Sequence, residues 1–413
     1  MRRSISRKAS VAGITVPFLL FVFVRILNFT SVDLRWSDTH LYKFFAESII
    51  AGQQPFSDFS VEYPPLTLIL FIIPGFVARY VGDFVTVFRI EMAIFDLGCL
   101  LLIGKLATLA FGSETKRMLL ALMLYIVLTA ISFQLIYDRF DMVVAFLLLL
   151  AIYLATIRRR WTGAYIAIWV AALIKLFPVI LFPLFLTMHM RESRNRNEVV
   201  NRFGLSVLVA IGAIIAVSFL VGDWSSVFAY HGKRGIQVES LYSAVALLAS
   251  LAGLPAQIKH EFGAYQITDS FTPFLAQASF VFMAFSLLAV YYFFWRAIRK
   301  SKDDTANSAR FIWSVLTALL AFVVLNKVLS PQFLIWLFPL AAIVAVYKKR
   351  PLIWSGLWIL TAILTGAIFP YHYQALIRME TGAILILVAR NILLVSLATI
   401  SLKAIIFARE RTL

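Results

Sequence analysis

The chain has 413 residues, of which 62% are hydrophobic and only 14% charged, with a mean hydropathy of +0.89. This composition excludes a water-soluble fold with an apolar core and a polar shell, and it is typical of a polytopic membrane protein. The net charge of +17 would suggest a nucleic-acid partner in a soluble protein, but most basic residues stand in short loops between apolar segments. Membrane topology explains the charge better, and we expect no nucleic-acid partner.

A single cysteine, Cys99, lies inside an apolar run, so the chain can build neither a disulfide framework nor a cysteine metal site. The sequence contains no internal repeat, no P-loop and no glycine-rich dinucleotide turn. Its longest polar segment, residues 223–273, is too short for a nucleotide-sugar domain. We therefore predict one integral membrane domain over residues 1–413, with no separate soluble domain and no cofactor.

About ten apolar segments are each long enough to cross a membrane roughly 30 Å thick. The first lacks a small-residue cleavage site, so it is expected to remain as a span. The predicted fold class is an all-α polytopic membrane protein built as a helix bundle. The segments lie near residues 11–30, 88–110, 118–136, 141–157, 203–222, 274–297, 310–326, 331–347, 352–370 and 381–403.

Two further apolar stretches, residues 66–80 and 163–187, are ambiguous. If neither crosses fully, the clusters of Lys and Arg sort to one side of the membrane, as the positive-inside rule requires. The stretch 66–80, broken by Pro74 and Gly75, then becomes an outer-face segment that dips into the interface. The stretch 163–187 becomes a hairpin of two half-length helices, and both chain ends are cytoplasmic.

In the alternative topology both stretches cross, which keeps the chain ends in place but moves Lys116, Arg117 and residues 158–160 outside. That arrangement breaks the charge rule twice. In the favoured topology the hairpin tip holds Lys175 and Pro178. Non-helical backbone at that depth must be buried in protein or line a wet cavity, and a lysine there is costly unless it is paired or faces water.

Acidic residues concentrate in the predicted external segments. Asp33 and Asp38 follow the first span, and Glu62 precedes Pro64 and Pro65, which stiffen the backbone around it. Both aspartates are also explained as solvated loop acids or helix caps, and Glu62 as part of a plain turn before a helix. If these acids serve catalysis, Asp38 is the preferred general base because it stays near the headgroup plane, and Asp33 is the fallback.

Asp138 and Asp141 stand three residues apart at an external helix start, a spacing that suits one helix face. They could bind a cation or orient an acceptor, while helix capping and dipole stabilisation are the commoner account of such acids. Arg89 and Asp96, seven residues apart within the span 88–110, also share a face. We expect those two to form an internal structural pair.

Basic residues on the outer side are candidates for binding a phosphate. Residues 231–240 bring His231 and Arg234 together with two glycines, although a basic loop also attracts anionic lipid headgroups. Lys327, in a short external loop, is a second phosphate candidate or a snorkelling anchor. Lys175 is a third candidate, or a lysine that snorkels from a tilted half-helix.

A sugar donor bound to a nucleotide would need a domain that this chain lacks, whereas a lipid-carried donor needs only the membrane. A sugar on a polyprenyl phosphate brings its own leaving group, since a phosphate departs without a general acid. The protein must then supply a base that activates the acceptor hydroxyl and cations that hold the departing phosphate. One carboxylate suffices for a transfer with inversion.

Five stretches together resemble the GT-C glycosyltransferases, most closely the polyprenyl-phosphate-mannose-dependent enzymes of glycosyltransferase family 87 and the first mannosyltransferase of GPI-anchor synthesis. They are residues 33–42 with 52–65, 137–141, 173–178, 231–240 and 326–333. The resemblance implies a GT-C-like membrane enzyme with its site on the non-cytoplasmic face. It would transfer a hexosyl residue, mannosyl by preference, from a polyprenyl-phosphate sugar to a lipid-linked or glycan acceptor.

The resemblance also maps the base to Asp38 and implicates Asp138, Asp141 and the Lys175–Pro178 hairpin. The first loop lacks a strict Asp-x-Asp, so we predict that no metal is required. The likeness to bacterial enzymes favours a place in the bacterial plasma membrane and a product in the cell envelope, while the endoplasmic reticulum stays open as the alternative membrane.

Two alternatives remain open at this point. A polytopic lipid or solute transporter would carry charges near the midplane, but such proteins usually show repeats with paired broken helices, and only one clearly broken stretch is present here. A catalytically silent assembly partner would keep the fold and tolerate replacement of Asp38.

Overall fold

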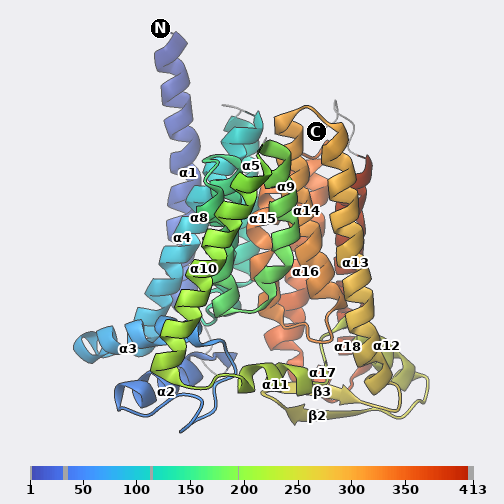
Figure 1. The fold of residues 1–413 in the computed structure, drawn as a ribbon. Coiled ribbons are helices and arrows are strands. Elements are labelled where there is room, and N and C mark those ends of the chain that lie inside the picture. The colour runs from blue at the N-terminus through green and yellow to red at the C-terminus, as the bar shows by residue number, and fades with distance from the viewer. Residues whose placement is uncertain (1, 31–35, 112–114, 194, 408–413) are drawn as a thin grey trace.

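The computed structural model describes residues 2–30, 36–111, 115–193 and 195–407. Long helices form a bundle, and short helices and strands cover one of its ends (Figure 1). We call this covered end the cap end; the N-terminal end of α1 lies at the opposite end. The bundle consists of α1 (Arg2–Thr30), α4 (Phe84–Phe111), α5 (Thr115–Ile131), α6 (Phe133–Ile136), α7 (Asp141–Thr156), α8 (Trp161–Ile174), α9 (Phe182–Glu192), α10 (Arg196–Val221), α13 (Thr272–Lys300), α14 (Asp304–Leu325), α15 (Phe338–Ala345), α16 (Pro351–Gly366) and α18 (Thr381–Phe407).

The cap end is built from segments that interrupt the order of the long helices. Its helices are α2 (Thr39–Ile50), α3 (Ile69–Val81), α11 (Ser226–Lys233), α12 (Leu241–Leu251) and α17 (Tyr373–Ile377). Its strands are β1 (Ile236–Gln237), β2 (Gln257–Glu261) and β3 (Ala264–Thr268). Short 3₁₀ helices lie at η2 (Pro65–Leu68), η3 (Phe177–Leu181) and η4 (Pro331–Trp336), and a short π-helix at η5 (Ala367–Tyr371).

The predicted fold class, an all-helical polytopic membrane protein, is confirmed. Among the described residues, five helices are long and apolar enough to cross a membrane: Arg196–Val221, Thr272–Arg299, Asp304–Leu325, Pro351–Tyr371 and Thr381–Phe407. The other predicted spans coincide with shorter apolar helices or, as in α4, with a long helix that carries several charged side chains.

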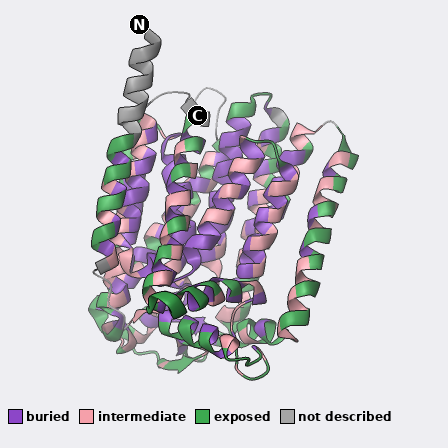
Figure 2. Cartoon of the chain, turned by 90° about the vertical axis from the view of Figure 1, so that its left-hand side faces the viewer, coloured by how far each residue is buried: buried purple, intermediate pink, exposed green. Residues whose placement is uncertain are grey.

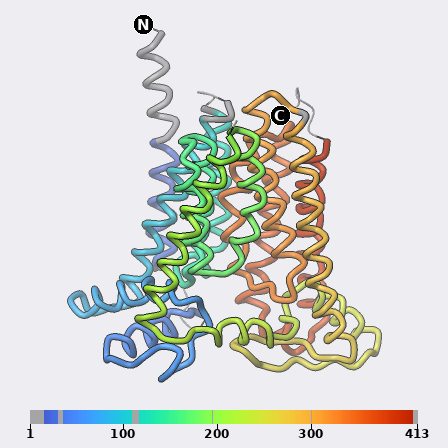
Figure 3. The backbone as a smooth tube through the Cα atoms, in the orientation of Figure 1, coloured from blue at the N-terminus to red at the C-terminus, as the bar shows by residue number. Residues whose placement is uncertain are grey.

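The two ambiguous stretches take distinct forms. α3 lies across the cap end instead of along the bundle (Figure 1), and Gly75 packs so closely on α2 that an added Cβ would stand 2.8 Å from the Ala46 Cβ. α8 and α9 have 14 and 11 residues, so they are about 21 Å and about 17 Å long and fall short of a bilayer core of roughly 30 Å. The tube in Figure 3 shows their hairpin.

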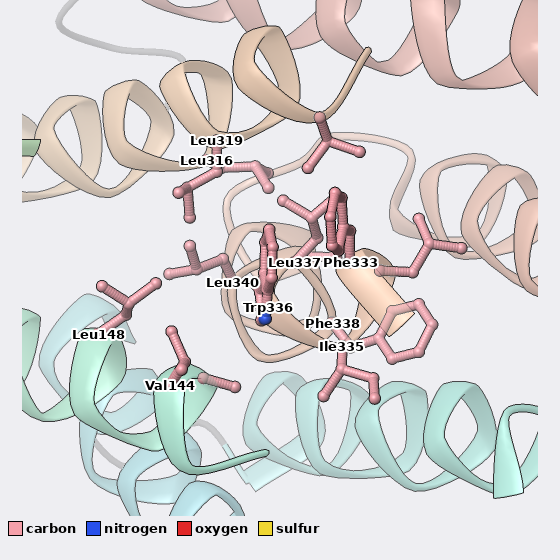
Figure 4. Packing of buried hydrophobic residues seen from close by; sticks show 14 of the residues in the cluster. Val144, Leu148, Leu316, Leu319, Phe333, Ile335, Trp336, Leu337, Phe338 and Leu340 are labelled. Carbon is pink, nitrogen blue, oxygen red and sulfur yellow. The ribbon is translucent and has the colours of Figure 1, made fainter. Parts of the chain in front are cut away.

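The core runs along the middle of the bundle. Buried residues line the inward sides of the helices, whereas exposed residues gather on outer helices and on the cap end (Figure 2). α14 is the most enclosed long helix, with 89% of its apolar window buried against 17% for α10 and α13. At its centre the Trp336 ring packs among Leu316 and Leu319 of α14 and Val144 and Leu148 of α7 (Figure 4).

A small antiparallel sheet in the order β1-β3-β2 lies on the cap end. Ile236 stands opposite Ile267, and Gln257 stands opposite Thr268. The sequence did not predict these strands, because two residues in β1 are too few for a periodic pattern. The sheet fixes residues 231–240 against the rest of the cap end.

Candidate active site

Asp38 immediately precedes α2 at the cap end, yet its side chain makes no capping hydrogen bond to that helix. Its Oδ2 lies 2.9 Å from Nε of Arg139, and the Tyr42 hydroxyl lies 3.5 Å from the same oxygen. The guanidinium is itself fixed, because its Nη2 donates to the Trp36 carbonyl at 2.9 Å. The loop acid is therefore held by a cation from the turn before α7.

The Asp38 carboxyl remains open to solvent, with 35% of its side chain exposed against 8% for Arg139. Desolvation by the surrounding protein raises the pKa of Asp38, Arg139 opposes that rise, and the Glu62 and Asp141 carboxylates add to it. The net result is a pKa above the ordinary value for aspartate. A carboxylate with a raised pKa is a stronger base, and this one is reachable by a substrate hydroxyl.

Asp141, the first residue of α7, forms a second charged cluster and is 1% exposed. Its Oδ1 accepts from Nζ of Lys175 at 2.6 Å and from Nε1 of Trp336 at 2.7 Å. The ammonium also lies 4.9 Å from the ring centroids of Phe140 and Trp336 and 5.4 Å from that of Phe333. This lysine is both paired and enclosed by aromatic faces.

Lys175 reaches this position because α8 ends at Ile174 and the backbone at Lys175 is extended. Two hydroxyls from other elements satisfy carbonyls at the break: Thr67 donates to the Ile174 carbonyl at 2.7 Å, and Tyr291 donates to the Ile180 carbonyl at 2.6 Å. Non-helical backbone inside a membrane bundle needs such partners. The break in the hairpin is thus a supported part of the fold.

Glu62 connects the first external segment with residues 231–240. The Tyr230 hydroxyl lies 2.5 Å from Glu62 Oε2 and 2.5 Å from the Phe262 carbonyl, and the Arg234 guanidinium lies 6.0 Å from the Tyr230 ring centroid. His231 is exposed and Arg234 is half-buried. Within the described part of the chain, no carboxylate lies at ion-pair distance from Arg234.

These charged groups are close enough to influence one another. After desolvation and Arg139, the pKa of Asp38 responds to Glu62 and also to Lys175. Desolvation lowers the pKa of His231 most, Arg234 lowers it further, and Glu62 and Lys175 also act on it. The structure therefore gathers the acids and the cations of four separate segments at one place on the cap end.

Asp138 faces away from this group. Its two oxygens meet Nε and Nη2 of Arg89 at 2.8 Å and 3.3 Å, and the carboxylate is 1% exposed. The expected pair of Arg89 with Asp96 is wrong, since Asp96 instead contacts Nε of Arg25 on α1 at 2.7 Å. Residues on one face of α4 have each found a partner on a different neighbouring segment, which spacing along one helix cannot reveal.

Asp96 is also fully satisfied. The hydroxyls of Tyr125 and Tyr137 donate to its two oxygens at 2.6 Å and 2.8 Å, and a second nitrogen of Arg25 lies 3.2 Å away. This buried network ties α1, α4 and α5 to the turn before α7. It is structural in character.

Lys327 contacts residues 231–240 and is buried, with 6% of the residue exposed. Its Nζ donates to the Gly232 carbonyl at 3.0 Å and also to the Arg234 carbonyl. It further lies 5.4 Å from the Phe280 ring centroid. The ammonium is thus directed at backbone oxygens.

The sequence predicted several of these groups but not all of their partners. Asp33 lies outside the described residues. Arg139, Trp336 and Tyr230 were not singled out, although Arg139 stands between the two acids of residues 137–141. Across the described ranges, no group of three or more His, Cys, Asp or Glu side chains could hold a metal ion.

Comparison with known proteins agrees with this architecture. The model of glycosyltransferase family 87 matches residues 61–268, just over half of the chain. That range contains Glu62, Asp141, Lys175 and Arg234, and Asp38 and Lys327 lie outside it. No curated protein matches the chain.

Two solved structures are similar in fold. The crystal structure of ArnT from Cupriavidus metallidurans in the apo state has a TM-score of 0.51 and 12% identity, covering 96% of this chain and 78% of that one. The structure of ArnT from the same organism bound to undecaprenyl phosphate has a TM-score of 0.49 and 13% identity, covering 96% and 77%. At this identity the likeness concerns the fold.

Proposed function

The chain belongs to glycosyltransferase family 87, and from that premise we propose that it transfers a mannosyl residue from a polyprenyl-phosphate carrier to a lipid-linked or glycan acceptor, with inversion. Membership in a glycosyltransferase family argues against the transporter alternative, and replacement of Asp38 is the test that separates an enzyme from a silent partner. The proposal places the reaction at the cap end, in the group around Asp38, Glu62 and Arg234.

In the proposed reaction Asp38 takes the proton of an acceptor hydroxyl, whose oxygen attacks the anomeric carbon of the donor sugar. The bond between that carbon and the phosphate oxygen breaks, and polyprenyl phosphate leaves with the electron pair. Arg139 orients the carboxylate, and its positive charge opposes the rise in the pKa of Asp38 that burial causes. Glu62 and Asp141 remain candidates for orienting the acceptor, Asp138 is a weaker one because it is paired with Arg89, and Asp33 stays the fallback base.

Cations near the base would stabilise the departing phosphate. Arg234 is the strongest candidate because its guanidinium is half-buried and unpaired among the described carboxylates, and His231 is exposed beside it. Lys175 would act more weakly, since Asp141 already shares its charge. Lys327 is the least suited, because its donors are directed at carbonyls.

The same proposal assigns the cap end to the non-cytoplasmic side of a bacterial plasma membrane, where the product would enter the cell envelope. It is supported by the basic residues near the chain ends and in the loops at the other end of the bundle. No metal is needed in this mechanism, since the cations come from side chains.

The observation that carries the proposal is the partly exposed Asp38 carboxylate beside Arg139. The test is transfer of radiolabelled mannose from polyprenyl-phosphate mannose to a membrane lipid extract, comparing wild type with Asp38→Asn at equal folded amounts. Asp223→Asn is the matched control, because Asp223 is an exposed acid at the cap end that bonds only its own turn. We expect loss of transfer in Asp38→Asn alone.

Equal transfer by wild type and Asp38→Asn would refute the base assignment and move it to the fallback Asp33 or to Glu62. If wild type transfers no mannose but does transfer another hexose from the same carrier, the sugar assignment fails and the site assignment is retained.

A further inference from the structure

Residues 231–240, here called the phosphate loop, are bound through their backbone to α18 and to the turn that follows α14. Beyond the end of α14, Lys327 donates to the Gly232 and Arg234 carbonyls. From α18, Arg390 donates to the Glu239 carbonyl at 2.7 Å. A cation from the segment after α14 and one from α18 thus hold carbonyls near both ends of the loop.

The amide groups of the phosphate loop are satisfied as well. Gly235 N donates to Oε1 of Gln266 at 2.7 Å, Gln237 N donates to the Lys327 carbonyl at 3.0 Å, and Val238 N donates to the Tyr265 carbonyl at 2.9 Å. At Gly235 an added Cβ would lie 2.4 Å from the same Gln266 oxygen. Backbone bonded on both sides in this way has little freedom to move.

Both cations are buried at a cost that membrane proteins seldom accept. Arg390 is 1% exposed on an otherwise strongly apolar helix, and among the described residues its Nε and Nη1 have no hydrogen-bond partner. The buried carboxyl of Glu239, itself a residue of the phosphate loop, is the charge that acts on it. Lys327 is 6% exposed and has no carboxylate partner among the described residues. A buried charge in an apolar span usually marks function, and these two are directed at one loop.

We propose that Lys327 and Arg390 are positioning residues that fix the phosphate loop so that Arg234 meets the phosphate of a polyprenyl-phosphate ligand. The inference rests on the function proposed above. Lys327 donates to the backbone carbonyl of Arg234, and the Arg234 guanidinium lies near Tyr230, whose hydroxyl bonds Glu62. The arrangement lowers the entropy that phosphate binding would otherwise have to overcome.

The test measures binding of undecaprenyl phosphate to the full-length protein in nanodiscs, so it does not depend on transfer. Wild type, Lys327→Met, Arg234→Gln and the double variant form a double-mutant cycle. We expect Kd to rise about tenfold in each single variant, and we expect Lys327→Met to add little once Arg234 is gone. Arg390→Leu should behave as Lys327→Met does, and Arg390→Lys should restore part of the affinity.

Lys348→Met is the control for removing a half-buried lysine. Lys348 lies 4.4 Å and 5.0 Å from the ring centroids of Trp313 and Trp354, away from the phosphate loop. We expect it to change thermal stability and leave Kd unchanged. Hydrogen exchange of the ligand-free protein provides the second readout: the amides of Gly235, Gln237 and Val238 should exchange faster in Lys327→Met than in Lys348→Met.

Additive effects of Lys327→Met and Arg234→Gln would overturn the inference, because Lys327 would then act independently of Arg234. Unchanged exchange in Lys327→Met would overturn it too, as would faster exchange with unchanged Kd. If wild type does not bind undecaprenyl phosphate, the assignment of residues 231–240 to phosphate binding is refuted. If Asp38→Asn loses transfer and the double-mutant cycle shows the expected coupling between Lys327 and Arg234, both proposals are supported. If the cycle shows that coupling but wild type transfers no sugar, only the proposed transfer reaction is refuted.

Discussion

Two arginine–aspartate pairs near the cap end use the same chemistry for different purposes. Arg25 and Asp96 are 7% and 0% exposed, and two tyrosine hydroxyls occupy the remaining capacity of that carboxylate. Asp38 has one close partner, Arg139, and is 35% exposed. The difference shows that residue type alone does not mark a reactive acid; open acceptor capacity and access do.

The sharpest test of this contrast replaces the open acid. Asp38→Asn should reduce kcat/KM for transfer by about a hundredfold or more, since general-base catalysis typically contributes about 10² to 10⁴. Thermal unfolding should shift less than in Asp96→Asn, because the Asp38 carboxylate is 35% exposed and the Arg139 guanidinium, which loses its counter-charge, keeps the Trp36 and Asp138 carbonyls as partners. A variant that unfolds early while retaining activity would reverse the roles assigned to the two pairs.

Asp96→Asn should give the opposite pattern. It leaves the Arg25 guanidinium buried without its counter-charge, which typically costs about 3 kcal/mol. We expect an early thermal transition in nanodiscs, while kcat/KM per folded molecule stays within about threefold of wild type. A folded, stable Asp96→Asn protein that lost transfer would place this network in the catalytic machinery.

A smaller effect is expected at the unpaired cation. Arg234→Gln should raise the donor KM about tenfold, equivalent to about 1.4 kcal/mol, because the phosphate loses one charged contact. The control is Arg202→Gln, which removes an exposed arginine paired with Glu198 at 2.7 Å on α10. If both variants bind donor equally well, the phosphate is held elsewhere.

The mildest perturbation concerns pH. Burial raises the pKa of Asp38, and Arg139 lowers it. Transfer needs the ionised carboxylate, so activity should fall as pH decreases through a pKa above the ordinary aspartate value. Removing the opposing charge in Arg139→Gln should raise that pKa further and move the acidic limb of kcat/KM to higher pH. A shift toward lower pH would contradict the ion pair.

The helical architecture could be predicted because the sequence pattern is strong. Long apolar runs leave only a helix bundle as a solution for the backbone in lipid, and the positive-inside rule identified 66–80 and 163–187 as unusual. The sequence analysis missed the small sheet. β1 could not be predicted, because it has two residues and its partner lies some thirty residues later, whereas β2 and β3 have five residues each and are joined by a turn at Phe262 and Gly263.

The site was predictable as a set of residue types, but not as a set of pairs. Asp38, Glu62 and Asp141 were identified because the predicted topology placed them in external segments. Their partners Arg139, Tyr230 and Trp336 come from segments up to nearly two hundred residues away, as in the contact between Asp141 and Trp336. The pairing of Arg89 was mispredicted for the same reason, because spacing along one helix says nothing about its neighbours.

The hairpin of α8 and α9 also bears on how the chain inserts and diversifies. Four residues separate the end of α7 from the start of α8, and α9 ends shortly before α10 begins, so the hairpin enters and leaves at one end of the bundle. The hairpin therefore adds no net membrane crossing, and the direction of α10 and of every later helix is the same with or without it. A sequence can gain, lose or reshape such an insert, and with it the depth of Lys175, without inverting the topology of the remainder.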